Sequence, residues 1–419
     1  MRLLPPLAAL AACLALPLTA STALSRPAPQ AARQERAPVT ILISIDGFRA
    51  DYLDRGETPV LSRLAAGGVH AAMRPSFPSK TFPNHWALVT GRVPDHNGIV
   101  GNSMKDPARP DETFTMANDD PFWWNEAAPV WEQAEKAGVR SATVFWPGSN
   151  VAWGGTKGDH KVSGGTRPED WLQFNQAVTA TQRVNTVLDW MRRPAAIRPR
   201  FVTLYFDTVD SAGHEYGPDA PETNTAIKEV DRNIGDLVAG LKALGQPVNL
   251  VIVADHGMAG TAPDRVVWLK DIADPADFTT VETGTYAAIY PQPGHEAALE
   301  KALDRQHDHL QCWAKAKIPA RFRYGSNPRV APWICLADVG WVVFDKPPHK
   351  VEGGNHGYDN EAPEMAALFV ANGPAFRAAG KLPSFDNVDV APLLRDLLKL
   401  PPASDADGND TPFRTVLKR

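Results

Sequence analysis

The sequence predicts an α/β fold in which a mainly parallel central sheet carries helices on both faces and a small inserted subdomain interrupts the chain. Short apolar runs, often β-branched, alternate with segments of helical periodicity, and such alternation is typical of parallel sheets that are covered on both sides. The alternation stops between residues 262 and 350, where turns, aromatic residues and two cysteines replace it. We therefore expect one large domain, residues 39–419, with an inserted subdomain at 262–350.

The expected strands are continuous apolar runs without polar alternation, which indicates strands that are buried on both faces. They are residues 39–45, 142–145, 201–206, 250–254 and 366–370. The expected helices lie between these strands. They are residues 59–66, 130–137, 184–191, 223–244 and 390–398. This order predicts that neighbouring strands run mainly parallel.

The composition is that of an ordinary globular protein, because 43% of the 419 residues are apolar and 22% are charged. Disordered and fibrous classes are thereby excluded. The formal net charge is -5, and lysine and arginine form no conspicuous run. We therefore expect no polymeric nucleic acid as a partner.

The N-terminal residues predict export. Residues 1–23 have the features of a secretory signal peptide, and the polar, proline-rich residues 24–38 are typical of a linker. Residues 10–13 also resemble a lipoprotein signal, which leaves lipidation of Cys13 open, although the apolar run before it is short. No later stretch is long and apolar enough to span a membrane. We expect a periplasmic or secreted protein without a transmembrane anchor.

Two further cysteines, Cys312 and Cys335, lie in the expected inserted subdomain. An even pair in an exported chain favours a disulfide, because export places the chain in an oxidising compartment. The alternative is a pair of buried free thiols. We predict the disulfide.

Six side chains of metal-ligand type lie at the expected ends of strands or in turns, where an α/β sheet presents side chains to ligands. They are Asp46, Asp210, His214, Asp255, His256 and His356. Any one of them alone is more often a helix cap or an ordinary buried side chain. Together they would carry large desolvation and like-charge costs unless cations compensated them. The sequence therefore predicts two metal ions, and the histidines favour zinc over magnesium.

The local sequence suggests how the ligands reach the metals. Asp210 and His214 can meet one ion if their segment is helical, although Gly213 between them favours a tighter turn. Adjacent side chains point apart, so a turn must redirect His256 or the aspartate before it, and Gly257 permits that turn. The last histidine lies in a glycine-rich loop that we expect to be flexible.

A proline-dense loop precedes an apolar run at residue 86, which places Thr81 near the N-terminus of an expected helix. Free N–H groups and the helix dipole stabilise negative charge there, so a phosphoryl group and an ionised hydroxyl can both be held. The alternative is an ordinary N-cap, and the metal ligands favour the nucleophile. Asn102, in a later turn-rich loop, is either a plain turn residue or a donor to a transition-state oxygen.

Several segments, in order along residues 39 to about 400, resemble the nucleotide pyrophosphatase/phosphodiesterase family of the alkaline phosphatase superfamily. They are IDGFR at 45–49, KTFPNH at 80–85, DSAGHEYGP at 210–218, ADHGM at 254–258, NHGYDN at 355–360, NGPAF at 372–376 and FDNV at 385–388. Ordered agreement of this length is highly specific. The resemblance implies an alkaline-phosphatase-like fold and two zinc ions.

The resemblance also implies a role for each site residue. One zinc is expected on Asp210, His214 and His356, and the other on Asp46, Asp255, His256 and the Thr81 oxygen. Asn102 matches the family's transition-state asparagine. Phe82 and Tyr205 match aromatic positions that stack on the nucleobase, although Tyr205 lies in an apolar strand and core packing is its alternative.

The implied reaction is hydrolysis of a phosphodiester or pyrophosphate bond in a small nucleotide, through a covalent intermediate on Thr81, with release of a nucleoside 5'-monophosphate. Two rivals stay open. The first is a phosphodiesterase acting on choline-headgroup lysophospholipids, which needs a cation-binding cage. The second is a phosphate monoesterase, which needs additional positive side chains. The choice among nucleotides and the oligomeric state also stay open.

Overall fold

An eight-stranded sheet forms the centre of this computed structural model, which describes residues 36–159 and 161–418. The expected signal peptide, with Cys13, and most of the expected linker lie outside the described residues. The strands follow the order β20 (Gly380–Lys381), β2 (Val69–Met73), β19 (Ala367–Asn372), β10 (Val248–Val253), β1 (Val39–Ile45), β9 (Phe201–Phe206), β5 (Ser141–Val144) and β8 (Asp170–Trp171). Nearly every side chain of β1, β9 and β10 is buried, as predicted for strands covered on both faces.

The sheet is mainly parallel, as predicted, with β19 as the exception. β1 pairs in parallel with both β9 and β10, whereas β19 is antiparallel to β10 and to β2. The chain reaches β19 through the short helix η5 (Pro363–Met365) and not through a full crossover helix, so the geometry that makes βαβ strands parallel does not apply. Strand β2 was not predicted, because its residues are buried only alternately and form no continuous apolar run.

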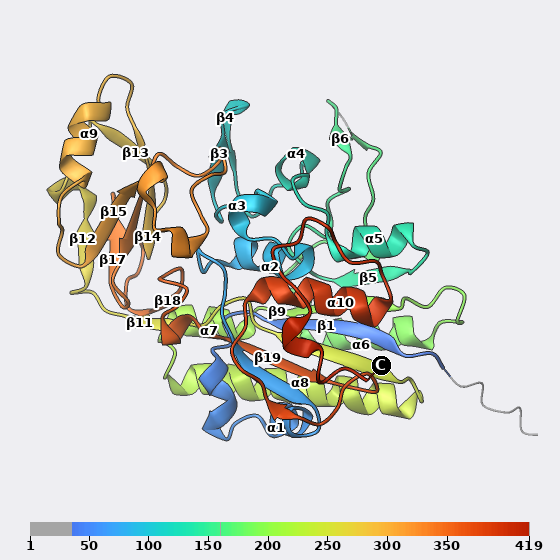
Figure 1. Ribbon diagram of the computed structural model, residues 1–419. Helices are drawn as coiled ribbons and strands as arrows, with labels where there is room; N and C mark the ends of the chain where they lie inside the picture. The colour runs from blue at the N-terminus through green and yellow to red at the C-terminus, as the bar shows by residue number, and fades with distance from the viewer. Residues whose placement is uncertain (1–35, 160, 419) are drawn as a thin grey trace, which may run out of the picture. The chain divides into compact units, whose positions relative to one another are not determined.

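Helices cover both faces of the sheet (Figure 1). On one face lie α1 (Pro59–Ala66), α6 (Ala180–Arg192) and α8 (Pro221–Ala243), and on the other lie α2 (Thr81–Thr90), α5 (Val130–Lys136) and α10 (Val390–Leu398). Local sequence sets their starts: a capping box of Thr179 and Gln182 begins α6, and proline occupies the first position of α8. The predicted helices are confirmed, with differences of a few residues at some ends.

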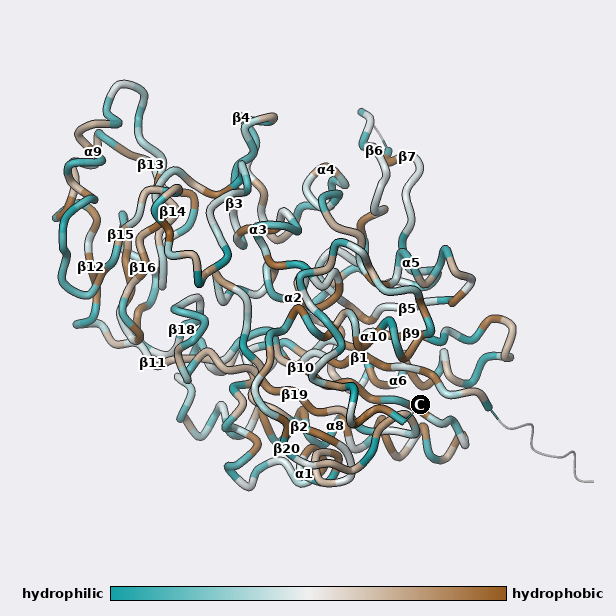
Figure 2. The backbone as a smooth tube through the Cα atoms, in the orientation of Figure 1, coloured by the Kyte–Doolittle hydropathy of each residue, from teal (hydrophilic) through white to brown (hydrophobic). Residues whose placement is uncertain are grey.

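A second sheet is built from the residues between β11 (Ala259–Thr261) and β18 (Gly353–Asn355), which pair with each other. Its strands follow the order β13 (Phe278–Glu282), β14 (Tyr286–Pro291), β16 (Trp333–Ala337) and β15 (Leu310–Ala314). Together with α9 (Glu296–Leu303) it encloses an apolar core of its own, and Figure 2 shows hydrophobic residues on its inner strands as well as on the central sheet. Cys312 and Cys335 lie opposite each other on β15 and β16 and form the predicted disulfide.

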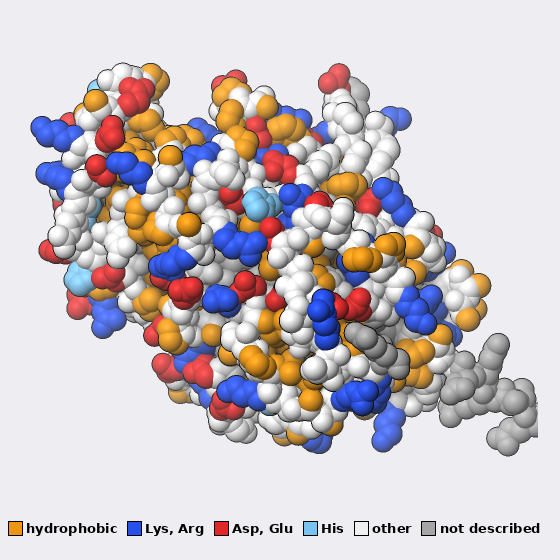
Figure 3. Space-filling model, viewed as in Figure 1, with side chains coloured by type: hydrophobic (Ala, Val, Ile, Leu, Met, Phe, Trp, Pro, Cys, Tyr) orange, Lys and Arg blue, Asp and Glu red, His pale blue; other side chains and the backbone are white. Residues whose placement is uncertain are grey.

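Charges of both signs are mixed on one face of the molecule. On the face drawn in Figure 3, lysine and arginine side chains lie among aspartate and glutamate and do not form one basic patch. Within the described ranges, no helix has the length and apolarity needed to cross a bilayer.

Candidate active site

The carboxyl ends of three neighbouring strands deliver the predicted acidic ligands to one place. Asp46 follows β1 directly, Asp255 follows β10 after one residue, and Asp210 lies in α7 (Thr208–Tyr216), just after β9. Parallel strands end at the same edge of a sheet, and this edge is where α/β proteins bind ligands. Gly47, with a φ of 67°, permits the close approach, because a Cβ there would lie 2.9 Å from the Cα of Asp210.

Three of the predicted ligands form a fully buried cluster, here called the inner group: Asp46, Asp255 and His256. Their ligand atoms lie within 4.8 Å of one another, and the residues are 1%, 0% and 0% exposed. His256 Nε2 lies 2.9 Å from Asp255 Oδ2 and 3.5 Å from Asp46 Oδ1. The Thr81 hydroxyl oxygen is 3.3 Å from the same His256 nitrogen, so the predicted nucleophile adjoins the inner group.

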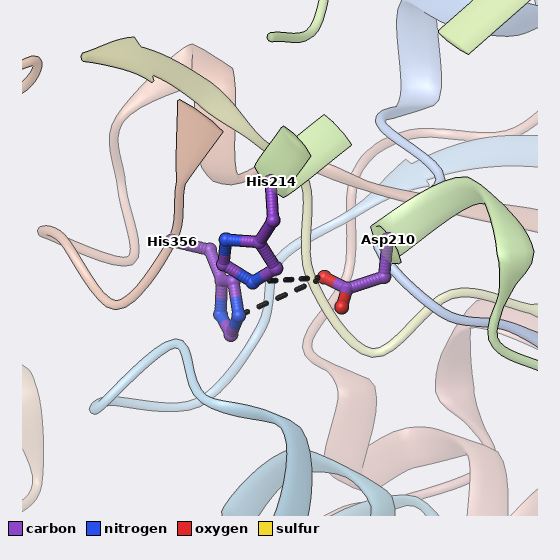
Figure 4. A group of neighbouring side chains, drawn as sticks. All are labelled: Asp210, His214 and His356. Carbon is purple, nitrogen blue, oxygen red and sulfur yellow. Dashed lines mark ion pairs between the residues drawn. The ribbon is translucent and has the colours of Figure 1, made fainter. Parts of the chain in front are cut away.

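The other three ligands form the outer group: Asp210, His214 and His356. Figure 4 shows both imidazoles turned toward the Asp210 carboxylate, whose Oδ1 is 3.5 Å from His214 Nε2 and 3.7 Å from His356 Nε2. This group is more open, since the side chains of Asp210 and His214 are 19% and 39% exposed. The rings of His356 and His256 are stacked with centroids 3.4 Å apart, so the two groups are adjacent.

Backbone carbonyls determine which nitrogen each histidine offers. In every case Nδ1 lies within hydrogen-bond distance of a carbonyl oxygen, and a carbonyl can only accept, so Nδ1 carries the proton and Nε2 the lone pair. The pairs are His214 with Gly354 at 2.8 Å, His256 with Gly257 at 2.9 Å and His356 with Ser79 at 2.9 Å. Metal-binding histidines are commonly oriented in this way.

The buried oxygens of both groups lack hydrogen bonds that a protein without cations would need. Among the described residues, one carboxylate oxygen of each of Asp46, Asp210 and Asp255 is buried without a hydrogen-bond partner. When His256 is neutral, with its proton on Nδ1, the short contact between its Nε2 and Asp255 Oδ2 joins two acceptors. A cation between such atoms would satisfy them all, so the residues fit metal ions.

The electrostatics lead to the same conclusion. Burial raises the pKa of Asp46, and the negative charges of Asp255 and Asp210 raise it further. Burial lowers the pKa of His356, as do His256 and Lys80, which keeps this imidazole neutral. Burial also lowers the pKa of His256, but the Asp255 carboxylate outweighs it and raises that pKa overall. Three carboxylates held this close in a dry site favour a bound cation.

Thr81 is the first residue of α2 and not its N-cap. Lys80 occupies the cap position, and no side chain caps the helix. The alternative of an ordinary N-cap is therefore wrong. The predicted partner Asn102 is also brought here, because its Oδ1 accepts a hydrogen bond from the backbone N–H of Phe82 at 3.0 Å. Its amide nitrogen is then the part that can donate to a ligand.

A cavity of about 630 Å³ opens over this centre. Thr81, Asn102 and the whole outer group line it, whereas Asp46 is the one inner-group residue among its lining. Phe82 and Tyr205, predicted to hold a nucleobase, also line the cavity, and the Tyr205 hydroxyl donates to Asp46 Oδ2 at 2.6 Å. This hydrogen bond connects one wall of the cavity to the inner group.

Sequence reasoning missed several residues of this cavity. Among the described residues that line the cavity, Lys80 is the one lysine or arginine. Its position next to Thr81 in the sequence could have identified it as a cavity residue. Met116, Leu172 and Phe174 also line the cavity and are 55%, 38% and 46% exposed. They lie in irregular segments that carry no recognisable pattern, so only the folded structure reveals them.

Three expectations about glycine need correction. Helix α7 runs without a break through Gly213. A Cβ at this position would lie 2.9 Å from Met258 Cε, so close packing against Met258 favours glycine here. At Gly257 the reason for glycine is close approach and not a special turn, since a Cβ would lie 2.0 Å from the Glu364 carbonyl oxygen. The glycine-rich segment before His356 was expected to be a flexible loop, but it is the paired strand β18.

Comparison with known proteins agrees with this geometry. The family model for type I phosphodiesterase / nucleotide pyrophosphatase matches residues 40–359. Bis(5'-adenosyl)-triphosphatase enpp4 of Xenopus laevis is 38% identical over 85% of this chain and 77% of its own length. A pyrophosphatase/phosphodiesterase of Schizosaccharomyces pombe, described as uncharacterized, is 37% identical over 86% of this chain and 77% of its own length.

Solved structures show the same fold. Murine ENPP5, as an inactive threonine-to-alanine variant in complex with AMP, superposes with a TM-score of 0.85 at 33% identity, covering 91% of this chain and all of that one. Human ENPP5 gives a TM-score of 0.83 at 32% identity over the same shares. The fold is alkaline-phosphatase-like, as predicted. The chain is a hydrolase that belongs to the type I phosphodiesterase / nucleotide pyrophosphatase family.

Proposed function

We propose that this protein hydrolyses phosphodiester or pyrophosphate bonds of small nucleotides with two zinc ions and a covalent intermediate on Thr81. One observation carries the proposal. Buried carboxylate oxygens without hydrogen bonds and three imidazole Nε2 atoms converge in two adjacent groups, and the Thr81 hydroxyl lies 3.3 Å from one of those nitrogens. Mixed oxygen and imidazole ligands favour zinc over magnesium.

Each of the two ligand groups would hold one of the two ions. The inner group, with the Thr81 oxygen, would hold one zinc, and the outer group would hold the other. When bound, such ions lower the pKa of a hydroxyl or water and stabilise phosphoryl oxygens. Thr81 would bond to phosphorus while the bond to the leaving oxygen breaks. Water would then cleave the threonine ester, which restores the hydroxyl and releases a nucleoside 5'-monophosphate.

Residues around Thr81 support charge development on the phosphoryl group. Thr81 is the first residue of α2, so the N-terminal end of this helix, with the positive end of its dipole, lies at the proposed nucleophile. The Asn102 amide nitrogen would donate to an oxygen that gains charge in the transition state. In murine ENPP5, a variant with alanine in place of a threonine is inactive, which supports a threonine nucleophile here.

The aromatic walls of the cavity favour a nucleotide. Phe82 and Tyr205 would stack on the base, and the exposed side chains of Met116 and Phe174 add apolar surface at the cavity. The murine relative was solved with AMP. Among the described residues that line the cavity, Lys80 is the one lysine or arginine. A phosphate monoester carries more negative charge than a diester and would need further positive side chains, so this lining disfavours it. We therefore rank the nucleotide diester above both rivals.

The surrounding organisation completes the proposal. Residues 39–419 would form the catalytic domain, with 262–350 as its inserted subdomain. Residues 1–23 would direct export to the periplasm or the medium, and residues 24–38 would link that signal to the domain.

The Thr81→Ala variant tests the covalent scheme. We expect turnover of a nucleotide diester to fall by about 10⁴-fold or more, while zinc content by elemental analysis stays at two ions per chain. Thr225→Ala, which removes an exposed hydroxyl on α8, is the matched control and should retain wild-type activity. Undiminished turnover by Thr81→Ala would end the covalent scheme.

A substrate panel tests the ranking. Rates on a nucleotide diester, a choline lysophospholipid and a simple phosphate monoester should fall in that order. Faster cleavage of the lysophospholipid would overturn the choice of substrate.

A further inference from the structure

We propose that the inserted subdomain is the positioning element of Asn102. Residues 98–106, the segment that carries Asn102, are held by side chains from three separate parts of that subdomain: Glu282, Tyr324 and Arg329. The inference rests on the proposed function, because it assigns those three residues to the placement of the transition-state donor named there.

The segment needs such support because it has little structure of its own. Residues 99–103 form neither helix nor strand, and the nearest regular element is the short strand β3 (Met104–Asp106). Asn102 reaches the catalytic centre through one hydrogen bond, from the Phe82 backbone N–H to its Oδ1. Its placement therefore depends on what holds the residues around it.

Arg329 holds both ends of the segment. Its side chain is 3% exposed, and its guanidinium donates to the Gly98 carbonyl at 2.9 Å and to Asp106 Oδ2 at 2.7 Å. It also donates to the Trp123 carbonyl at 2.7 Å, next to Trp124 in the cavity wall. Gly98 leaves room for this contact, since a Cβ there would lie 2.8 Å from the Arg329 Nη1. A buried guanidinium that donates hydrogen bonds to a carboxylate and to several carbonyl oxygens is a rigid connection.

Tyr324 and Glu282 hold the middle of the segment. The Tyr324 hydroxyl donates to the Val100 carbonyl at 2.7 Å, two residues before Asn102. The carboxylate of Glu282 accepts from the Ser103 backbone N–H at 3.2 Å, directly after Asn102. Asn102 is thus bracketed by contacts on both sides. Glu282 lies at a β-bulge in β13, a feature that commonly redirects a side chain beside an active site.

The holding residues are themselves anchored to the central domain. Asp95, in α3 (Pro94–Asn97), accepts backbone N–H bonds from Gly325, Ser326 and Asn327, each at 2.9 Å. These three residues lie between Tyr324 and Arg329. The subdomain and the Asn102 segment therefore form one hydrogen-bonded assembly, in which a shift of the subdomain would move Asn102.

Conservative variants with matched controls test the proposal. Tyr324→Phe and Arg329→Lys remove hydrogen bonds to residues 98–106 while keeping most of each side chain. Tyr290→Phe and Arg321→Lys change the same residue types within the subdomain. The Tyr290 ring, whose centroid is 5.7 Å from Lys105 Nζ, is kept in its variant, and the Arg321 guanidinium donates to Asp359, outside the segment. Hydrogen exchange of residues 98–106 should rise about tenfold in the test variants and stay unchanged in the controls.

Kinetics then show whether the effect acts through Asn102. We expect kcat to fall about threefold in Tyr324→Phe and about tenfold to 100-fold in Arg329→Lys, with little change in KM. In an Asn102→Ala background the same substitutions should cause no further loss, because the group they position is gone. Unchanged exchange in both test variants, or losses that multiply with that of Asn102→Ala, would overturn the proposal.

The design separates this proposal from the proposed function. If Asn102→Ala alone retained full activity, the catalytic role of Asn102 would be wrong. Exchange in residues 98–106 would still report whether Tyr324 and Arg329 hold the segment. Tyr324→Phe, which loses one oxygen atom, keeps the test available even if Arg329→Lys fails to fold.

Discussion

The inner and outer ligand groups are built from the same two residue types, aspartate and histidine, but differ in their surroundings. The inner group has two carboxylates and one imidazole, all at most 1% exposed, at the ends of central strands. The outer group has one carboxylate and two imidazoles, and its members line the cavity. The difference indicates a division of labour: the inner group adjoins Thr81, the proposed nucleophile, and the outer group faces the space that a substrate would occupy.

The same difference has an energetic consequence. Charges in the inner group are shielded from water, so each carboxylate there depends on a cation or a hydrogen bond for compensation. Water can compensate part of the charge in the outer group, since the Asp210 carboxylate that carries this charge is on a side chain that is 19% exposed. Substitutions in the two groups should therefore differ in size and in the ease of chemical rescue.

The largest effects are expected from two single variants, each of which removes a histidine from one of the groups. His256→Ala should lower kcat/KM by about 10³-fold or more, because the inner metal site keeps its two buried carboxylates but loses its one imidazole ligand. His214→Ala should lower it by about 10²-fold. Added imidazole should restore activity partly in His214→Ala and not in His256→Ala, because only the outer position opens to the cavity. Assays with and without imidazole decide this, and equal rescue of both variants would remove the distinction.

A smaller effect, on zinc affinity, is expected from removing the hydrogen bond between Tyr205 and the inner group. Tyr205→Phe removes the donor 2.6 Å from Asp46 Oδ2 but keeps the ring. We expect zinc affinity of the inner group to fall about tenfold, as is typical when a ligand loses its supporting hydrogen bond. Zinc titration with competing chelators measures this. KM for a nucleotide should change little, and a raised KM with unchanged zinc affinity would assign Tyr205 to the base alone.

The smallest effect concerns the metal-free protein. Burial and neighbouring carboxylates raise the pKa of Asp46 in the folded state, so its ionisation destabilises the fold as pH rises above the ordinary value of 3.8. Asp46→Asn should therefore raise the Tm of the metal-free protein by about 2–4 °C at neutral pH. The gain should disappear near pH 3, where Asp46 is protonated in both states.

Asp210→Asn is the matched comparison for that measurement, because Asp210 is 19% exposed and water already compensates part of its charge. Thermal unfolding in the presence of a chelator should show a smaller gain for this variant. An equal or larger gain would mean that burial does not distinguish the two groups.

Much of the fold could be predicted from local sequence. Strands β1 and β9 and helices α1 and α10 have the predicted bounds, because continuous apolar runs and helical periodicity are local properties. The antiparallel direction of β19 could not be predicted, because it depends on the path of the chain through the second sheet. Strand β2 was missed because strands near a sheet edge lack a continuous apolar run.

The ligand types and their order along the chain were determined by the sequence itself, since six acidic and histidine side chains after buried strands would together be costly to bury without cations. The family resemblance implied which ligands share a group, whereas only the tertiary structure decided how deeply each group is buried and which nitrogen each histidine offers. The tertiary structure also decided that Tyr324, Glu282 and Arg329 contact the Asn102 segment. These last contacts join residues that are more than a hundred positions apart in the chain, and local patterns carry no information about such contacts.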